Sequence, residues 1–460
     1  MRVVIQNANI VLPHKDTILT NSSMVIENGL ISKIIKGVTF SYDSKANLIV
    51  DADNDYLIPG IIDHHVHAVS LGPLFGSAFP APPLELVISN LNKHLLQGTT
   101  TILNQDGFAT MEETEIMNKL HPIKIKSSTS HTPTNIQAAE MTDGSDLNSF
   151  HKNLTMDSML GRGAVAIGEI GDGNTLGGTG VCYNLLPKKI EEKTGKRINP
   201  AEAEKLMWAV LGRYIDTSVT DRGKVGTILE EIGLKGLISV SDTVNIILEG
   251  VYSPVETARN GIREAAEFAL RYNIPMEVHT AAGCKEVVLE VAEKLGSKLI
   301  TAHSSHPSFT TDEVVENIKK LKCFGAIIDI CCGDYFVAKK LCPPEYLDVN
   351  LHLIEEGLVD LISTDFLAGN WDPILLIIKK AVEEEKISLP SILAMVSCNV
   401  VKAIPKLAPN TGFIEEGKTA DLVVLNSNNI AEVRHVFIDG LPVVIDGEIK
   451  APKVNWLWVM

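Results

Sequence analysis

The chain has 460 residues, and 41 Lys and Arg against 57 Asp and Glu give it a formal net charge of −16 with histidine neutral. Its 45% apolar and 21% charged residues are typical of a globular protein and exclude a disordered or fibrous chain. The acidic balance argues against a nucleic-acid partner, and no apolar run approaches the ~18 residues that a membrane span needs.

The chain's first residues become polar too early for a secretion signal. Its seven cysteines are irregularly spaced, which favours free thiols in a reducing compartment over a disulfide framework. We therefore expect a cytoplasmic protein that is not bound to a membrane. Large α/β enzymes are often symmetric oligomers, so we expect a homo-oligomer acting on a small-molecule substrate.

Both ends of the chain are rich in Val and Ile and are broken by Asn, Gly and Asp, as short strands joined by turns would be. Each end holds too few strands to be stable alone. We therefore expect residues 1–56 and 409–460 to form one small β-sandwich domain together. The predicted strands lie at 2–12, 23–37, 47–53, 412–425 and 433–447.

Between these ends, apolar strands alternate with amphipathic helices. This pattern predicts an α/β fold, a (β/α)8 TIM barrel over residues 57–408. An open doubly wound sheet is the alternative, but no Gly-rich phosphate turn follows the first strand. The fourth and fifth strands are too far apart for a simple connection, so an insertion is expected at about 172–250. It should contain a helix around 202–214 and a short strand at 236–240. The predicted barrel strands are 57–68, 99–104, 123–129, 164–170, 274–280, 299–304, 324–330 and 360–365.

Polar side chains stand where several of these strands end. His65 and His67 are two positions apart on the first strand, so both imidazoles face the same way. Barrel enzymes carry their active sites at this carboxyl end. A charged or imidazole side chain that ends an apolar strand is costly unless it is paired or binds a metal. The other residues placed in this way are Glu169, His279, His303 and Asp365, on strands four, five, six and eight.

Four histidines and two carboxylates suit one or two borderline divalent ions. Zinc is favoured, although iron, manganese, cobalt and nickel also bind such ligands. The sequence therefore predicts a metal site. Each of the six residues, considered alone, could also have an ordinary structural role.

Three segments of the sequence resemble the amidohydrolase superfamily. They are the first-strand motif PGIIDHHVH at 59–67, the strand-two entry QGTTT at 97–101 and GFIEEGKTADLV at 412–423. Shorter segments at 168–171, 278–280, 332–333 and 364–365 are similar to its enamidase-like cyclic amidohydrolases. The long insertion departs from that group's pattern.

The resemblance implies roles for the strand-end residues. His65, His67 and Asp365 would bind the more buried metal ion of a binuclear centre. His279 and His303 would bind the more exposed ion. Glu169 would bridge the two ions, at the position where many relatives have a carboxylated lysine.

These roles predict a metal-dependent hydrolase that cleaves the C–N bond of an amide, with a cyclic amide favoured, by means of a metal-activated hydroxide. Asp365 would serve as general base and then as general acid. The first alternative is a metal-dependent deaminase of a small nitrogen heterocycle. A phosphotriesterase-like activity and a non-catalytic scaffold of the same fold are weaker alternatives.

Five further residues are of interest in the sequence. His131 follows strand three and either contacts substrate or lies exposed in a loop. Cys331 and Cys332 are expected to be buried structural thiols. Asp106 is expected to cap a helix. Asp63 is expected to orient a metal ligand or the strand end.

Overall fold

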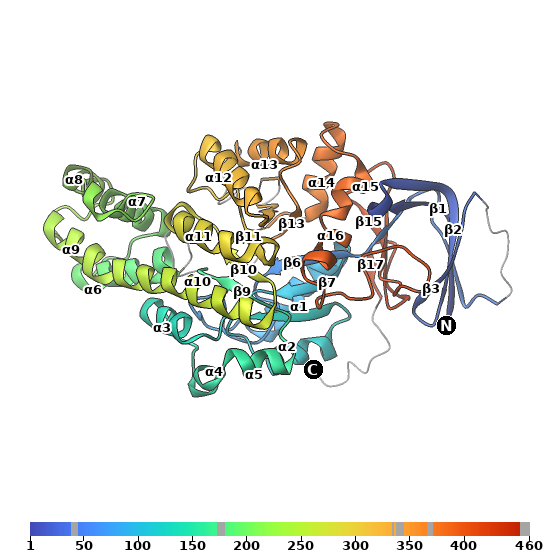
Figure 1. The fold of residues 1–460 in the computed structure, drawn as a ribbon, viewed down its shortest axis with the longest axis horizontal. Helices are drawn as coiled ribbons and strands as arrows, with labels where there is room; N and C mark the ends of the chain where they lie inside the picture. The colour runs from blue at the N-terminus through green and yellow to red at the C-terminus, as the bar shows by residue number, and fades with distance from the viewer. Residues whose placement is uncertain (38–44, 173–179, 334, 337–344, 366–370, 451–460) are drawn as a thin grey trace.

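A computed structural model describes residues 1–37, 45–172, 180–333, 335–336, 345–365 and 371–450. Within them the chain forms a barrel of eight parallel strands beside a second, largely antiparallel sheet built from both ends of the chain (Figure 1). The predicted fold class is therefore confirmed. Among these residues, no helix combines the length and the apolar character needed to cross a bilayer.

The barrel strands neighbour one another in chain order, and each pairs in parallel with the next. The last strand closes onto the first, where the Asp365 backbone N–H donates to the His65 carbonyl at 3.1 Å. Parallel order brings all carboxyl ends to one rim. The strands are β6 (Ile61–Val66), β7 (Thr99–Asn104), β8 (Lys124–Thr129), β9 (Ala166–Ile170), β10 (Met276–His279), β11 (Leu299–Ala302), β12 (Ile327–Cys331) and β13 (Leu361–Ser363).

Helices cover the outside of the barrel and turn their apolar faces inward. The helix at Thr311–Cys323 begins with a capping box, in which Thr310 and Glu313 bond each other's backbone N–H groups. The helices are α1 (Leu84–Leu96), α2 (Met111–Leu120), α3 (Pro133–Thr142), α4 (Ser149–Asn153), α5 (Met156–Arg162), α10 (Tyr252–Tyr272), α11 (Lys285–Leu295), α12 (Thr311–Cys323), α13 (Glu345–Glu355), α14 (Ile374–Glu383), α15 (Leu389–Ala394) and α16 (Cys398–Ala403).

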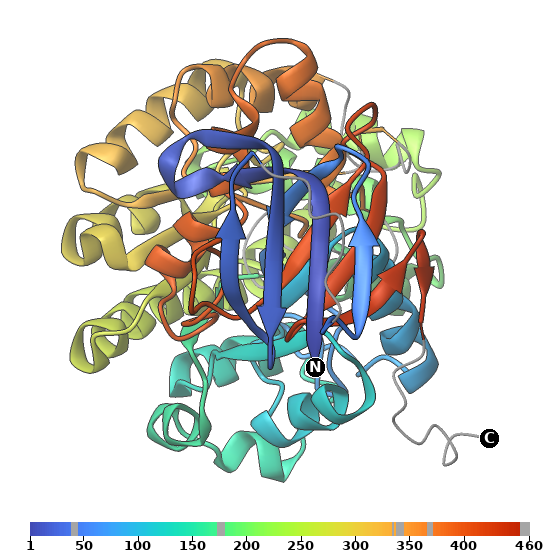
Figure 2. The ribbon, with the colours of Figure 1, turned by 90° about the vertical axis from the view of Figure 1, so that its right-hand side faces the viewer.

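The two chain ends share one continuous sheet, seen face-on in Figure 2. Its central junction is the antiparallel pair β5–β14, in which Leu57 lies opposite Val424. The sheet consists of β1 (Arg2–Leu12), β2 (Thr17–Glu27), β3 (Leu30–Ile35), β4 (Leu48–Asp51), β5 (Tyr56–Pro59), β14 (Leu422–Leu425), β15 (Val433–Ile438), β16 (Leu441–Ile445) and β17 (Glu448–Ile449).

Several predicted strands differ from the structure. The run at 23–37 is divided between β2 and β3, and the run at 433–447 is divided between β15 and β16. The strand expected at 57–68 is two strands: β5 belongs to the small sheet and β6 to the barrel. Gly60 separates them at a point where a Cβ would lie 2.2 Å from Thr100 Oγ1, so only glycine fits there. The strand expected at 412–425 is reduced to β14.

The insertion between β9 and α10 is helical and has its own apolar core. It projects from the end of the molecule opposite the small sheet (Figure 1). The strand expected at 236–240 is wrong: only an isolated bridge between Lys235 and Ile238 forms there, and α9 begins at Val240. Residues 173–179 of the expected insertion lie outside the described residues. Its helices are α6 (Leu186–Thr194), α7 (Pro200–Leu211), α8 (Arg222–Glu231) and α9 (Val240–Gly250).

Candidate metal centre

The six predicted ligands converge at the carboxyl rim of the barrel, around the carboxylate of Glu169 at the end of β9. Glu169 Oε2 lies 3.4 Å from His65 Nε2 and 3.5 Å from His67 Nε2. Its other oxygen lies 3.1 Å from His279 Nδ1 and 2.9 Å from His303 Nε2. One buried carboxylate thus faces all four imidazoles.

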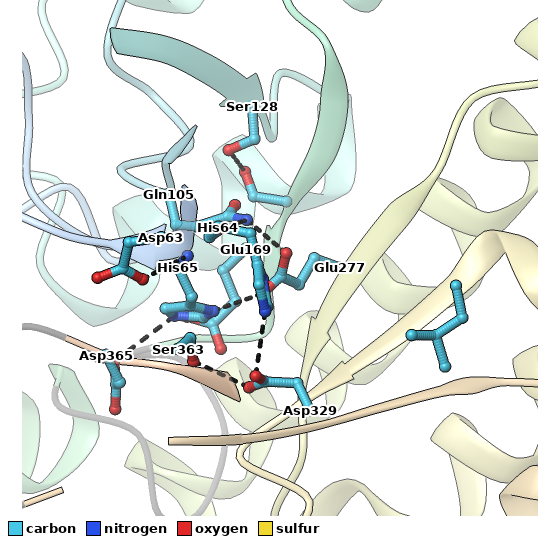
Figure 3. A network of polar contacts seen from close by, with 12 residues as sticks. Asp63, His64, His65, Gln105, Ser128, Glu169, Glu277, Asp329, Ser363 and Asp365 are labelled. Atoms are coloured by element: carbon cyan, nitrogen blue, oxygen red, sulfur yellow. Dashed lines mark hydrogen bonds and ion pairs between the residues drawn. The ribbon is translucent and has the colours of Figure 1, made fainter. Parts of the chain in front are cut away.

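Asp365 stands at the solvent side of this cluster and follows β13 directly. Its Oδ1 lies 3.5 Å from His65 Nε2 and 3.8 Å from His67 Nε2, while its Oδ2 lies 3.3 Å from His303 Nδ1. A third of the Asp365 side chain is exposed (33%), whereas Glu169 is buried (1%). Figure 3 shows His65, Glu169 and Asp365 turned toward one another. Asp365 is therefore the member of the cluster that incoming water can reach.

The donor atoms are close enough to share a cation. The atoms of His65, His67 and Asp365 lie within 4.8 Å of one another, and so do those of His65, Glu169 and His303. His279 is in none of the four such groups found among the described residues, but it contacts Glu169. Two inward-facing atoms have no hydrogen-bond partner, and buried polar atoms of this kind are rare without a bound ion or water. They are His65 Nε2 and Glu169 Oε2.

The electrostatics of the cluster centre on Glu169. Burial alone would raise the pKa of Glu169, but His65 and His303 outweigh it and hold that pKa well below its usual range. Burial would lower the pKa of His65, but Glu169 and Glu277 hold it well above its usual range. The site is therefore built to keep positive charge beside an ionised carboxylate. A divalent cation bound by neutral imidazoles supplies that charge.

Carboxylates behind the ligands set the ring orientations of the first-strand histidines. Glu277 Oε1 lies 2.6 Å from His65 Nδ1, and Gln105 donates to the other Glu277 oxygen at 2.7 Å. Asp106 Oδ1 lies 2.9 Å from His67 Nδ1. Each contact leaves the Nε2 atom of its ring facing Glu169 and Asp365.

Two predictions about supporting carboxylates have different outcomes. The expectation that Asp106 caps a helix is wrong, because Thr110 caps α2 and Asp106 accepts from His67 and two backbone N–H groups. Asp63 does orient the strand end, as expected: it accepts from the Thr364 hydroxyl at 2.6 Å and from the Thr364 backbone N–H at 3.2 Å. Asp63 thereby holds the residue that precedes Asp365.

Two residues near the cluster were not among the ligands predicted from the sequence. Asp172 is buried and lies within 4.8 Å of His67 and Glu169, and burial together with Glu169 raises its pKa to about 6. Cys331 is only half-buried and shares a group with His303 and Asp365, so its expected role as a buried structural thiol is wrong. Its neighbour Cys332 is fully buried, as expected. Cys331 ends a barrel strand, which is the signal that identified the other ligands.

His131 is placed differently from the six ligands. The side chain is almost fully buried, so the exposed-loop reading is wrong. Its Nδ1 lies 3.0 Å from Thr129 Oγ1, and its ring packs edge-on against Phe108. Burial lowers the pKa of His131 to about 4. Among the described residues, none of the four possible ligand groups includes it.

Sequence comparison finds similarity to one family of enzymes. The sequence model of the amidohydrolase family matches residues 241–443. The chain is 22% identical to an imidazolonepropionase of Treponema denticola over 88% of this chain and 86% of the relative. It is 23% identical to a dihydroorotase of Clostridioides difficile over 92% of this chain and 90% of the relative.

Solved structures share the fold along nearly the whole chain. A β-aspartyl dipeptidase of Fervidobacterium islandicum aligns with a TM-score of 0.57 at 16% identity, covering 98% of this chain and 100% of that one. An L-hydantoinase (dihydropyrimidinase) of Arthrobacter aurescens aligns with a TM-score of 0.51 at 15% identity, covering 98% and 97%. The chain is thus similar to amidohydrolase-family proteins along nearly its whole length, and the solved structures show that it shares their fold.

Proposed function

We propose that this protein is a metal-dependent hydrolase that cleaves a carbon–nitrogen bond in a small cyclic amide. The observation that carries the proposal is the buried Glu169 carboxylate, which faces four imidazoles while Asp365 closes the cluster on its solvent side. The names of two relatives, imidazolonepropionase and dihydroorotase, support a cyclic substrate. All six expected ligand positions are filled, which argues against a scaffold that has lost its chemistry.

The residues fit one or two divalent ions. His65, His67 and Asp365 would hold one ion, His279 and His303 the second, and Glu169 would bridge them. Histidine and carboxylate donors favour zinc, with iron, manganese, cobalt and nickel as alternatives. When bound, such an ion polarises a carbonyl group and makes water acidic enough to ionise near neutral pH.

Asp365 performs the proton transfers in this proposal. It takes a proton from the attacking water and gives it to the nitrogen, which must be protonated to leave. Its partial exposure lets water approach, and its Oδ2 lies 3.3 Å from His303 Nδ1. Asp63, through Thr364, fixes the backbone that carries Asp365. Cytoplasmic location and homo-oligomerisation stay predictions of the sequence.

The test is a substrate screen with the zinc-loaded protein. A panel of hydantoins, dihydropyrimidines, imidazolones and lactams is incubated with enzyme, and the products are analysed by mass spectrometry and by an ammonia assay. The proposal predicts a product with the mass of the substrate plus one water and no ammonia release. Ammonia release without ring opening would instead identify a deaminase. No turnover across the panel by metal-loaded protein would contradict the proposal.

A further inference from the structure

A thiol-containing group of donor atoms lies on the solvent side of His303, next to the centre described above. A ring nitrogen of His303, Cys331 Sγ and an Asp365 oxygen lie within 4.8 Å of one another. His303 Nε2 is turned the other way, 2.9 Å from Glu169 Oε1. The imidazole therefore presents one nitrogen to Glu169 and its other nitrogen, Nδ1, to Asp365.

His303 Nδ1 is a buried atom that lacks a hydrogen bond. The residue is only 4% exposed, and no hydrogen-bond partner reaches this nitrogen, although Asp365 Oδ2 is 3.3 Å away. A buried polar atom without a partner is destabilising and calls for a ligand. The unsatisfied nitrogen thus points independently to an occupant of this group.

Strand geometry explains why Cys331 reaches this position. Cys331 ends β12 and pairs with Ser363 of β13, two residues before Asp365. Successive strand residues face opposite sides, so Cys332 is turned away, and its thiol donates to the Asp372 carbonyl at 2.8 Å. Only Cys331 of this adjacent pair belongs to the group with His303 and Asp365.

We propose that His303 Nδ1, Cys331 and Asp365 form an additional binding site for a thiophilic divalent cation such as Zn²⁺ or Cd²⁺. Sulfur, imidazole and carboxylate together suit soft and borderline ions. Binding forms metal bonds to the Cys331 sulfur and to His303 Nδ1, and the thiol proton and the Nδ1 proton leave to solvent. An ion held here occupies the Asp365 carboxylate, so it inhibits proton transfer; this second part rests on the function proposed above.

The binding test uses zinc-loaded protein titrated with Cd²⁺, because thiolate–cadmium bonds absorb in the ultraviolet and bonds to His or carboxylate do not. Wild type is compared with Cys331→Ser and with Cys323→Ser, which removes an exposed thiol at the end of α12. We expect the band in wild type and Cys323→Ser and its loss in Cys331→Ser. No band in wild type, or an equal band in Cys331→Ser, would overturn the proposal.

A second measurement needs no variant. Wild-type zinc-loaded protein is alkylated with iodoacetamide with and without Cd²⁺, and the modified peptides are identified by mass spectrometry. We expect Cd²⁺ to slow labelling of Cys331 at least about tenfold while Cys323 labels as before. Equal labelling of Cys331 in both conditions would contradict the site.

Inhibition tests the second part separately. With a substrate from the screen, the Cd²⁺ concentration that halves turnover should be at least about tenfold higher in Cys331→Ser than in wild type. An equal half-inhibiting Cd²⁺ concentration in the two proteins would show that a cation at this site does not inhibit the enzyme. If the screen finds no substrate, the absorption band and the labelling still decide whether the cation binds, so failure of the proposed function and failure of this site are distinguishable.

Discussion

Glu277 Oε1 lies 2.6 Å from His65 Nδ1, and this contact determines which nitrogen of His65 is available to a metal. The N–H at Nδ1 donates to the carboxylate, so the lone pair at Nε2 faces Glu169 and Asp365. Gln105 holds the second Glu277 oxygen at 2.7 Å. The ring of His65 is thus oriented by a residue from β10, on another side of the barrel.

We expect Glu277→Gln to weaken zinc binding about 10- to 100-fold, because an amide is a poorer acceptor for the His65 N–H. Zinc affinity is measured by competition with a chelator. Glu290→Gln makes the same change on the exposed face of α11, where the side chain pairs with Arg263, and should leave affinity unchanged. Equal affinities for both variants would show that Glu277 does not support the metal site.

Asp365→Asn should fold normally and keep most of its metal, because asparagine is close in size and the four histidines and Glu169 remain. The amide cannot carry the proton, so kcat should fall by about 10²- to 10⁴-fold or more. Metal content and kcat are measured on one preparation. Activity within a few-fold of wild type with metal intact would mean that another group moves the proton.

His131→Ala should leave metal content unchanged.

The barrel and the convergence of the six proposed ligands at its rim could be predicted because both follow from local patterns. Apolar strands alternate with helices, and a histidine or carboxylate that ends such a strand is destabilising without a partner. Parallel order then places His65, Glu169 and Asp365 on one rim, whatever their separation in the chain.

Other features depend on contacts that no local pattern reveals. Gly60 divides one apolar run between two sheets, because the close approach of Thr100 leaves no room for a side chain. Asp106 has the sequence position of a helix cap, yet the chain folds it under His67. Asp172 lies beyond the end of its strand, so its approach to Glu169 depends on the path of a loop.

The helical insertion is attached to the barrel by a charged contact. Arg213 donates to Glu313 at 2.7 Å and to the Ser308 carbonyl at 2.8 Å, on the segment that follows His303. The hydrogen bond from Arg213 is the main reason that the pKa of Glu313 falls to about 2. A carboxyl group whose pKa is lower in the folded state than in the unfolded state stabilises the fold at pH values above its unfolded-state pKa. That stabilisation is lost as the pH falls through the folded-state pKa.

We therefore expect Arg213→Met to lower the melting temperature at pH 7. The difference in melting temperature between the variant and wild type should become smaller below about pH 4.5, the ordinary glutamate pKa, and should disappear toward pH 2. Arg197→Met, which breaks an exposed pair with Glu191 inside the insertion, should have little effect at any pH. A difference that does not depend on pH would mean that Arg213 acts through packing alone.

The junction of the two chain ends should be essential for solubility. Val424 is fully buried in β14 opposite Leu57, so Val424→Asp places an unpaired charge in the core of the small sheet. We expect most of this variant in the insoluble fraction after expression. Leu441→Asp, at a half-exposed position of β16, should stay soluble. A soluble Val424→Asp protein would show that the ends fold independently.

The most direct test of the central claim is the metal content of purified protein, measured by inductively coupled plasma mass spectrometry after growth with added zinc. A binuclear centre predicts about two divalent ions per chain in wild type and the loss of at least one in His65→Ala. His352→Ala, on the exposed face of α13, should match wild type. Wild-type protein without metal, or His65→Ala protein with the full wild-type content, would contradict the account.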